Sequence, residues 1–314
     1  MTAVVPTPAT GAAAPAPSFA GPEDVARRLD ALDYLVDDGL AMAIHLAAAL
    51  GRPLLLEGEP GVGKTTAAKA LARALGAPLI RLQCYEGLTA RESLYEWNHA
   101  RQLLAIRLAE ARHERLADAD LFTEEFLAER PLLRAVRHPG PTPAVLLIDE
   151  IDRADDEFEA LLLEYLGEAS VTVPELGTFT ARRPPVTVLT SNRSRDLHDA
   201  LRRRCLYHWI PFPSRARAAA IVRRSVPAAG EPLVASTTRF VESVRGLDLD
   251  KPPGMAETID WVSALAALGA ADLTVGLGVP TLGTVAKTPD DVTRIAAALT
   301  GDDPAAPPVD RSDR

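Results

Sequence analysis

Residues 58–65 decide the fold of this chain, and they read Gly58-Glu59-Pro60-Gly61-Val62-Gly63-Lys64-Thr65. The stretch fits the pattern G-x-x-x-x-G-K-[ST] in full, and the apolar run 53–56 lies just before it. This context predicts a strand that delivers the loop to the edge of a sheet, glycines that let backbone N–H groups face phosphate oxygens, and a helix over residues 65–75. The sequence therefore predicts a phosphate-binding loop for a nucleoside triphosphate.

The two residues that end this loop have separate expected tasks. Lys64 is expected to reach the β- and γ-phosphates, and Thr65 to give its hydroxyl to Mg²⁺. A glycine-rich turn alone is also compatible with a structural bend. The complete pattern, with a strand before it and a helix after it, favours an ATP site lined by all eight residues.

Two acids follow the most apolar segment of the chain. Residues 144–148 form a continuous apolar run, typical of a strand buried on both faces of a parallel sheet, and Asp149 and Glu150 come directly after it. Ligands bind at the carboxyl ends of such strands. We expect Asp149 to hold Mg²⁺, directly or through water, and Glu150 to orient and deprotonate an attacking water. The alternative is that Asp149 caps the next helix and Glu150 is solvated.

Asn192 follows another expected strand, residues 186–190. The parallel arrangement would place it beside Asp149, where its amide could hold the water or the γ-phosphate. Taken alone, an Asn after a strand is more often a turn former.

Three consecutive arginines, Arg202, Arg203 and Arg204, follow a short helical segment. Such a run is often a solvated face or a complement to the end of a helix. The alternative is an arginine finger, whose planar cation neutralises charge on a transferring phosphoryl group. A finger that acts on a neighbour's nucleotide requires the enzyme to oligomerise.

The order of helical and strand patterns predicts an α/β domain over residues 23–213, with a parallel five-stranded sheet and helices on both faces. The expected strands are 53–56, 78–83, 144–148, 186–190 and 206–210, and residues 170–173 and 177–181 read as a β-hairpin. Long helices are expected over residues 93–116 and 123–136. From residue 214 to 300 only helical patterns occur, which predicts a small all-helical lid domain. Residues 1–22 and 301–314 read as a disordered arm and a disordered tail.

Composition limits the class of protein. The 314 residues are 47% hydrophobic and 25% charged, as in an ordinary soluble protein, and the net charge of -9 argues against a protein that coats nucleic acid. The longest apolar segment, residues 39–50, is shorter than the roughly 20 residues of a membrane span. Two distant cysteines, Cys84 and Cys205, are expected to be buried reduced thiols, in keeping with the cytoplasm.

The phosphate-binding loop, residues 145–152, Asn192 and residues 200–204, in this order, resemble those of an AAA+ ATPase. The segments 52–65, 82–87, 94–98 and 201–210 are similar to the MoxR group of AAA+ proteins, and within it to the subgroup associated with maturation of carbon monoxide dehydrogenase and related molybdenum hydroxylases. The resemblance covers residues 23–268.

This resemblance implies a role for each motif. Residues 58–65 would be the Walker A loop, Asp149 and Glu150 the Walker B pair, and Asn192 the sensor-1 residue. Arg204 best matches the arginine finger, with Arg202 second. Members of this group typically form hexameric rings and partner a protein with a von Willebrand factor A domain. They use ATP to insert metal into a client metalloenzyme or to remodel it.

One segment departs from the group's pattern. Many relatives supply a sensor-2 arginine from a Ser-Pro-Arg in the lid, whereas residues 251–255 here read Lys-Pro-Pro-Gly-Met. Lys251 is a point charge and cannot make a bidentate phosphate contact. Three alternatives to a motor remain open: a nucleotide-dependent scaffold or regulatory switch with little turnover, a small-molecule kinase, and a DNA-directed AAA+ protein.

Overall fold

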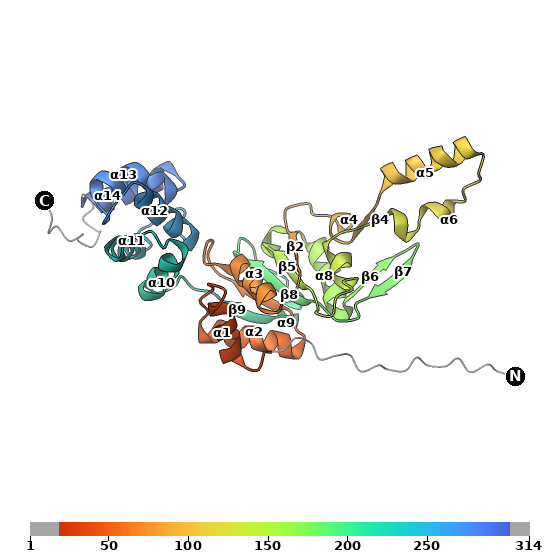
Figure 1. Ribbon diagram of the computed structural model, residues 1–314, viewed down its shortest axis with the longest axis horizontal. Helices are drawn as coiled ribbons and strands as arrows, with labels where there is room; N and C mark the ends of the chain where they lie inside the picture. The colour runs from red at the N-terminus through yellow and green to blue at the C-terminus, as the bar shows by residue number, and fades with distance from the viewer. Residues whose placement is uncertain (1–18, 302–314) are drawn as a thin grey trace.

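The computed structural model describes residues 19–301, so residues 1–18 of the expected arm and 302–314 of the expected tail lie outside the described residues. Figure 1 shows three parts in a row: a group of C-terminal helices at one end, a sheet with its helices in the middle, and a projection that carries α5 at the other end.

The central sheet contains five parallel strands, as the sequence predicts. They are β1 (Leu54–Glu57), β2 (Leu79–Gln83), β5 (Val145–Asp149), β8 (Val186–Ser191) and β9 (Leu206–Trp209), in the order β2-β5-β8-β1-β9. The register sets Gln83 opposite Asp149 and Glu57 opposite Ser191. The ends of four strands that carry polar side chains therefore meet at one edge.

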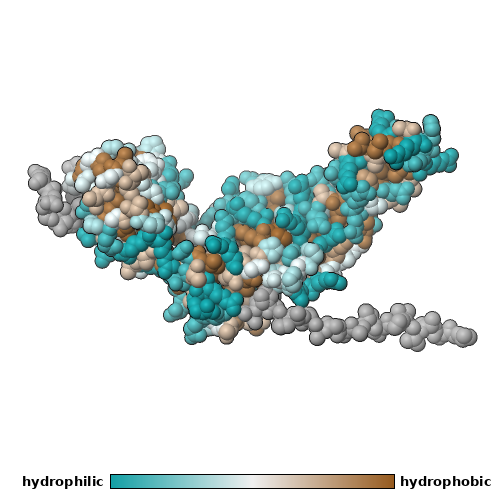
Figure 2. Space-filling view, in the orientation of Figure 1, coloured by the Kyte–Doolittle hydropathy of each residue, from teal (hydrophilic) through white to brown (hydrophobic). Residues whose placement is uncertain are grey.

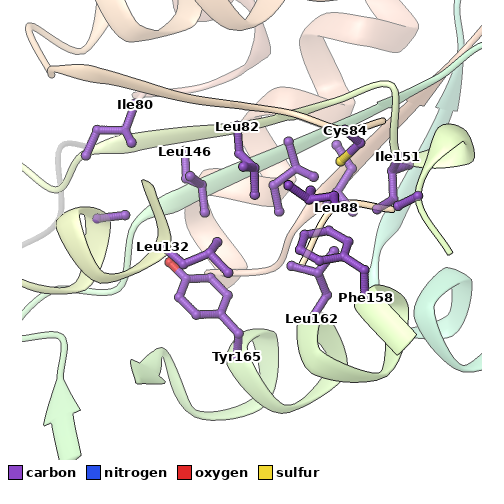
Figure 3. Packing of buried hydrophobic residues seen from close by; sticks show 14 of the residues in the cluster. Ile80, Leu82, Cys84, Leu88, Leu132, Leu146, Ile151, Phe158, Leu162 and Tyr165 are labelled. Atoms are coloured by element: carbon purple, nitrogen blue, oxygen red, sulfur yellow. The ribbon is translucent and has the colours of Figure 1, made fainter. Parts of the chain in front are cut away.

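Helices cover both faces of this sheet. Leu54 and Leu56 of β1 pack with α1 (Pro22–Asp30), α2 (Asp38–Leu50) and α3 (Lys64–Ala74). Leu55 points to the other face, toward α7 (Pro131–Val136), α8 (Asp156–Glu168) and α9 (Asp199–Arg204). Figure 3 shows this second core, where Leu146 of β5 lies among side chains of α7 and α8. Burial on both faces explains why β5 is apolar from Val145 to Ile148, before it ends at Asp149.

The ordered part of the chain begins before residue 23, within the expected N-terminal arm of residues 1–22. Phe19 is 3% exposed and packs with the core of α1 to α3, and the Arg28 guanidinium lies 5.3 Å from the centre of its ring. Helix α1 begins at Pro22, a residue suited to the first helical position.

Of the two long helices expected between β2 and β5, the first, over residues 93–116, is continuous only over residues 99–112, and the second, over residues 123–136, is an α-helix only over residues 131–136. The chain instead forms α4 (Ala90–Ser93), β3 (Tyr95–Trp97), α5 (His99–Arg112), α6 (Asp118–Leu121), η1 (Glu124–Phe126), β4 (Leu127–Glu129) and α7. Strand β3 pairs antiparallel with β4, and the Trp97 ring packs edge-on against Phe122. These contacts between distant residues override the local helical pattern.

Helix α5 projects away from the sheet (Figure 1), and its residues Leu103, Leu104 and Leu108 are exposed. Figure 2 shows apolar colour at this end of the molecule. The predicted hairpin is confirmed as β6 (Ser170–Val173) and β7 (Gly177–Thr180).

The C-terminal part of the described chain is helical. It contains α10 (Arg215–Ser225), α11 (Glu231–Val244), α12 (Met255–Ala267), α13 (Val275–Thr281), η3 (Leu282–Thr284) and α14 (Pro289–Thr300). These helices share a core of their own around the fully buried Trp261. Among residues 19–301, none of the helices combines the length and the apolar content that crossing a membrane requires.

Candidate functional site

A cavity of about 760 Å³ lies where the carboxyl edge of the sheet meets the C-terminal helices. It brings together most of the site residues that the sequence singles out. Its lining includes residues 60–65 of the phosphate-binding loop, Asp149, Glu150 and Asn192, together with Tyr34, Phe212, Arg217 and Met255. The predicted loop residues Gly58 and Glu59 lie behind this lining, where their carbonyl groups serve Lys64.

The phosphate-binding loop connects the end of β1 to the start of α3. Gly63 precedes the first helical residue with a φ of 99°, a left-handed conformation that favours glycine, and no side chain caps the helix. The first N–H groups of α3 are thus without a side-chain partner, which suits an anion. Lys64 donates from Nζ to the carbonyl oxygens of Gly58 (2.7 Å) and Glu59 (2.9 Å). Burial lowers the pKa of Lys64, against the attraction of nearby carboxylates such as Asp152.

Asp149 is 2% exposed, and its two oxygens have different partners. The Thr65 hydroxyl donates to Oδ1 at 2.9 Å, and the Thr190 hydroxyl donates to the same atom at 2.6 Å. Arg81 of β2 donates to Oδ2 from Nε (2.9 Å) and Nη2 (2.6 Å). Asp149 does not cap the next helix, because Asp155 caps α8. A carboxylate next to a Thr hydroxyl, beside a loop for phosphate, is a donor set that could hold Mg²⁺.

Glu150 lies at a left-handed position of the backbone, with a φ of 56°. This conformation costs a non-glycine residue on the order of 1 kcal/mol or more. Its N–H donates to the Thr190 hydroxyl at 2.9 Å, and its Oε2 accepts from Gln83 Nε2 at 3.0 Å. Arg153 Nη1 lies 3.2 Å from the same oxygen. The strained turn thus places a partly exposed carboxylate on the cavity wall.

Asn192 lines the cavity beside Asp149 and Glu150, and a buried acid that sequence reasoning missed holds its backbone. Its N–H donates to Asp152 Oδ1 at 3.2 Å, while Ser194 donates to Oδ2 from its N–H (2.8 Å) and its hydroxyl (2.7 Å). Asp152 is 2% exposed. One signal in the sequence could have identified Asp152: it follows Asp149 by three residues, in the turn directly after the same buried strand.

The three arginines of α9 do not line this cavity, which is formed by the described residues of the same chain. Arg204 donates to the Leu163 carbonyl of α8, and Arg202 Nη1 lies 3.5 Å from the Glu57 carboxylate. Arg52, just before β1, donates to the carbonyls of Arg203 (2.9 Å) and Arg204 (3.3 Å) and so fixes the end of α9. Within one chain, no α9 arginine among residues 19–301 lines the cavity.

The start of α12 contacts the phosphate-binding loop through main chain. Met255 N–H donates to the Gly61 carbonyl at 2.9 Å, and a Cβ on Gly254 would lie 2.8 Å from Gly61 Cα. Arg217 of α10 donates to the Leu35 carbonyl at 2.6 Å and pairs with Asp37 at 3.2 Å. Lys251 is exposed and is not part of the cavity lining. A glycine therefore meets the loop where relatives were expected to bring an arginine.

The sheet order, the phosphate-binding loop and the two acids at the end of β5 are those of the P-loop AAA+ fold. The family model described as AAA domain (dynein-related subfamily) matches residues 53–205. No curated protein gives a significant match to the chain.

Similar solved structures include RuvB from Thermotoga maritima. One, described as the RuvB Holliday junction branch migration motor, has a TM-score of 0.45 and 18% identity over 84% of this chain and 69% of that chain. A point mutant of the same protein has a TM-score of 0.46 and 18% identity over 85% and 71% of the two chains.

Proposed function

We propose that this chain is an ATP-hydrolysing AAA+ motor of the MoxR group that remodels or matures a client enzyme in the cytoplasm. The observation that supports the proposal best is that one cavity gathers the loop, Asp149, Glu150 and Asn192 at a single edge of the sheet. Those are the parts that hydrolysis of a nucleoside triphosphate needs.

Each residue has a task that its position supports. The uncapped start of α3 and the Lys64 ammonium would hold the phosphates, and Thr65 and Asp149 would hold Mg²⁺. When bound, Mg²⁺ neutralises charge on the β- and γ-phosphates. Glu150 would take the proton of the attacking water, and Asn192 would orient that water or the γ-phosphate.

Assembly forms part of the proposal. Arg204, or failing it Arg202, would reach the nucleotide of a neighbouring copy, because neither lines the cavity of its own chain within residues 19–301. Chains that each lend a residue to the next form a closed ring, which we propose to be a hexamer. The resemblance to the MoxR group extends this to a partner with a von Willebrand factor A domain and to a client metalloenzyme.

Steady-state ATP hydrolysis, measured over a range of protein concentrations, tests the motor and its assembly together. The rate per chain should rise with concentration, and Arg204→Ala should lower it at every concentration. Arg107→Ala is a matched control, because Arg107 forms its salt bridge with exposed Glu110 on the projecting α5. A rate per chain that is independent of concentration and survives Arg204→Ala would exclude catalysis between copies.

Glu150→Gln tests the chemistry itself. It should keep nucleotide affinity and lower turnover by roughly 10²-fold or more, as loss of a general base does. The scaffold alternative is favoured by one observation: Gln83 and Arg153 both hold the Glu150 carboxylate. Under that alternative, Glu150→Gln and the parent protein would show the same background rate.

A further inference from the structure

Arg81 has a conspicuous position that the roles above do not use. It lies on the edge strand β2 opposite Leu147, and its side chain reaches two residues further along β5 to Asp149. Both Nε and Nη2 donate to one oxygen, Oδ2, at 2.9 and 2.6 Å. The guanidinium is a permanent cation, so this contact is charge-assisted.

Because of this contact, both carboxylate oxygens of Asp149 already accept hydrogen bonds. Oδ1 already accepts from the Thr65 and Thr190 hydroxyls. The Thr65 hydroxyl donates its proton to Oδ1, so its own lone pairs remain directed elsewhere and can face a cation. Arg81 donates two hydrogen bonds to Oδ2, so a cation that bound Asp149 would have to compete with a protein donor at either oxygen.

We propose that Arg81 is a positioning residue that competes with Mg²⁺ for Asp149 and thereby sets how much Mg²⁺ nucleotide binding requires. The inference rests on the proposed function. In the metal-free protein Arg81 neutralises a carboxylate whose side chain is 3% exposed. Its own side chain is 48% exposed, so the guanidinium can leave Oδ2 toward solvent without uncovering the core.

A second contact keeps the displaced guanidinium at the site. Arg81 Nη2 also donates to Gln83 Oε1, and the Gln83 amide donates to Glu150 Oε2 at 3.0 Å. Arg81 released from Asp149 can therefore stay bound to Gln83. The two acids of the site are joined through β2 as well as through their own strand.

Binding of a fluorescent ADP analogue, first in EDTA and then over a Mg²⁺ titration, measures the competition without any turnover. Arg81→Ala should lower the half-saturating Mg²⁺ concentration by roughly tenfold or more, because two hydrogen bonds to a charged group no longer compete with the cation. Arg81→Lys keeps the charge but loses the forked geometry, and it should give a smaller shift in the same direction. Electron paramagnetic resonance of bound Mn²⁺ gives a second measurement, in which Arg81→Ala should bind the ion most tightly, Arg81→Lys less tightly and the parent protein least.

The temperature of thermal unfolding measures how much Arg81 stabilises the protein when no cation is bound. In EDTA, Arg81→Ala should unfold at a lower temperature than the parent, because Asp149 then lacks its cation. Mg²⁺ with nucleotide should narrow that difference. Arg107→Ala removes an exposed arginine that pairs with a carboxylate, and it should leave both measurements unchanged.

The outcomes separate the two proposals. If the parent protein binds no nucleotide with or without Mg²⁺, the proposed function fails. If nucleotide binds but neither Arg81→Ala nor Arg81→Lys lowers the half-saturating Mg²⁺ concentration, the competition is refuted and the function stands. If Arg81→Ala does not fold, Arg81→Lys decides the question alone.

Discussion

The hydroxyl of Thr190 donates to Asp149 Oδ1 at 2.6 Å, from a side chain that is 1% exposed. The Thr190 hydroxyl oxygen in turn accepts the backbone N–H of Glu150 at 2.9 Å. One hydroxyl on β8 therefore fixes both acids at the end of β5.

Thr190→Val is expected to lower the free energy of unfolding by about 1–3 kcal/mol, because it leaves the partly buried Glu150 N–H without its acceptor. Turnover should fall as well, whereas Thr190→Ser should restore both. Urea unfolding and phosphate release measure the two effects. Thr172→Val is the control, since the Thr172 hydroxyl contacts Thr178 on the exposed hairpin. Equal losses in both Val variants would contradict the role of Thr190.

Asp152→Ala should displace Asn192 while it leaves the hydrogen bonds of Lys64 and Thr65 in the phosphate-binding loop in place. It removes the acceptor of three hydrogen bonds, one from Asn192 and two from Ser194. We expect a lower kcat and a nucleotide Kd within a few-fold of the parent value, measured by phosphate release and by titration. A loss of nucleotide affinity with unchanged kcat would show that Asn192 acts differently.

Gly254→Ala tests the contact between the lid and the loop. The new Cβ would meet Gly61 Cα at 2.8 Å and the Pro60 carbonyl at 3.0 Å, and backbone cannot move aside as a side chain can. The Met255–Gly61 hydrogen bond should break, at a cost of about 1 kcal/mol. Faster hydrogen exchange of the Met255 amide would report this. Gly276→Ala, where a Cβ meets open space, should leave that amide protected.

The two buried cysteines should make the stability of the protein depend on pH. Burial raises the pKa of both Cys84 and Cys205 to about 12. Unfolded thiols ionise near about 8.5, so stability falls as the pH rises through that value toward 12. Alkylation of the native protein should be slow at pH 8 and rise steadily with pH. A plateau near the unfolded value would mean that these cysteines are accessible.

The sequence predicted the parts of the site whose spacing is short. The eight-residue loop and the Asp149-Glu150 pair are contiguous patterns that carry their own chemistry, and the apolar run before each one predicts a strand. Because parallel strands end at one edge, the placement of Asn192 near them also followed from topology.

Other features depend on distant residues and left no local pattern. Arg81 and Gln83 contact the acids because β2 lies beside β5. The order of strands in a sheet cannot be predicted from local sequence patterns. The segment with β3 and β4 reads as helix because its neighbours in sequence favour helix, yet Trp97 gains its contacts from Leu127 and Phe122. The burial of Phe19 likewise depends on a partner surface and not on local composition.

Arg52 joins two features that would otherwise be separate. Its guanidinium binds the carbonyl groups at the end of α9, and its backbone leads directly into the strand that carries the phosphate-binding loop. The strand that carries a protomer's own phosphate-binding loop is thus tied directly to the helix whose arginine would reach the next copy of the proposed ring. A shift of β1 during hydrolysis would move the end of α9, so one nucleotide site in the ring would influence its neighbour.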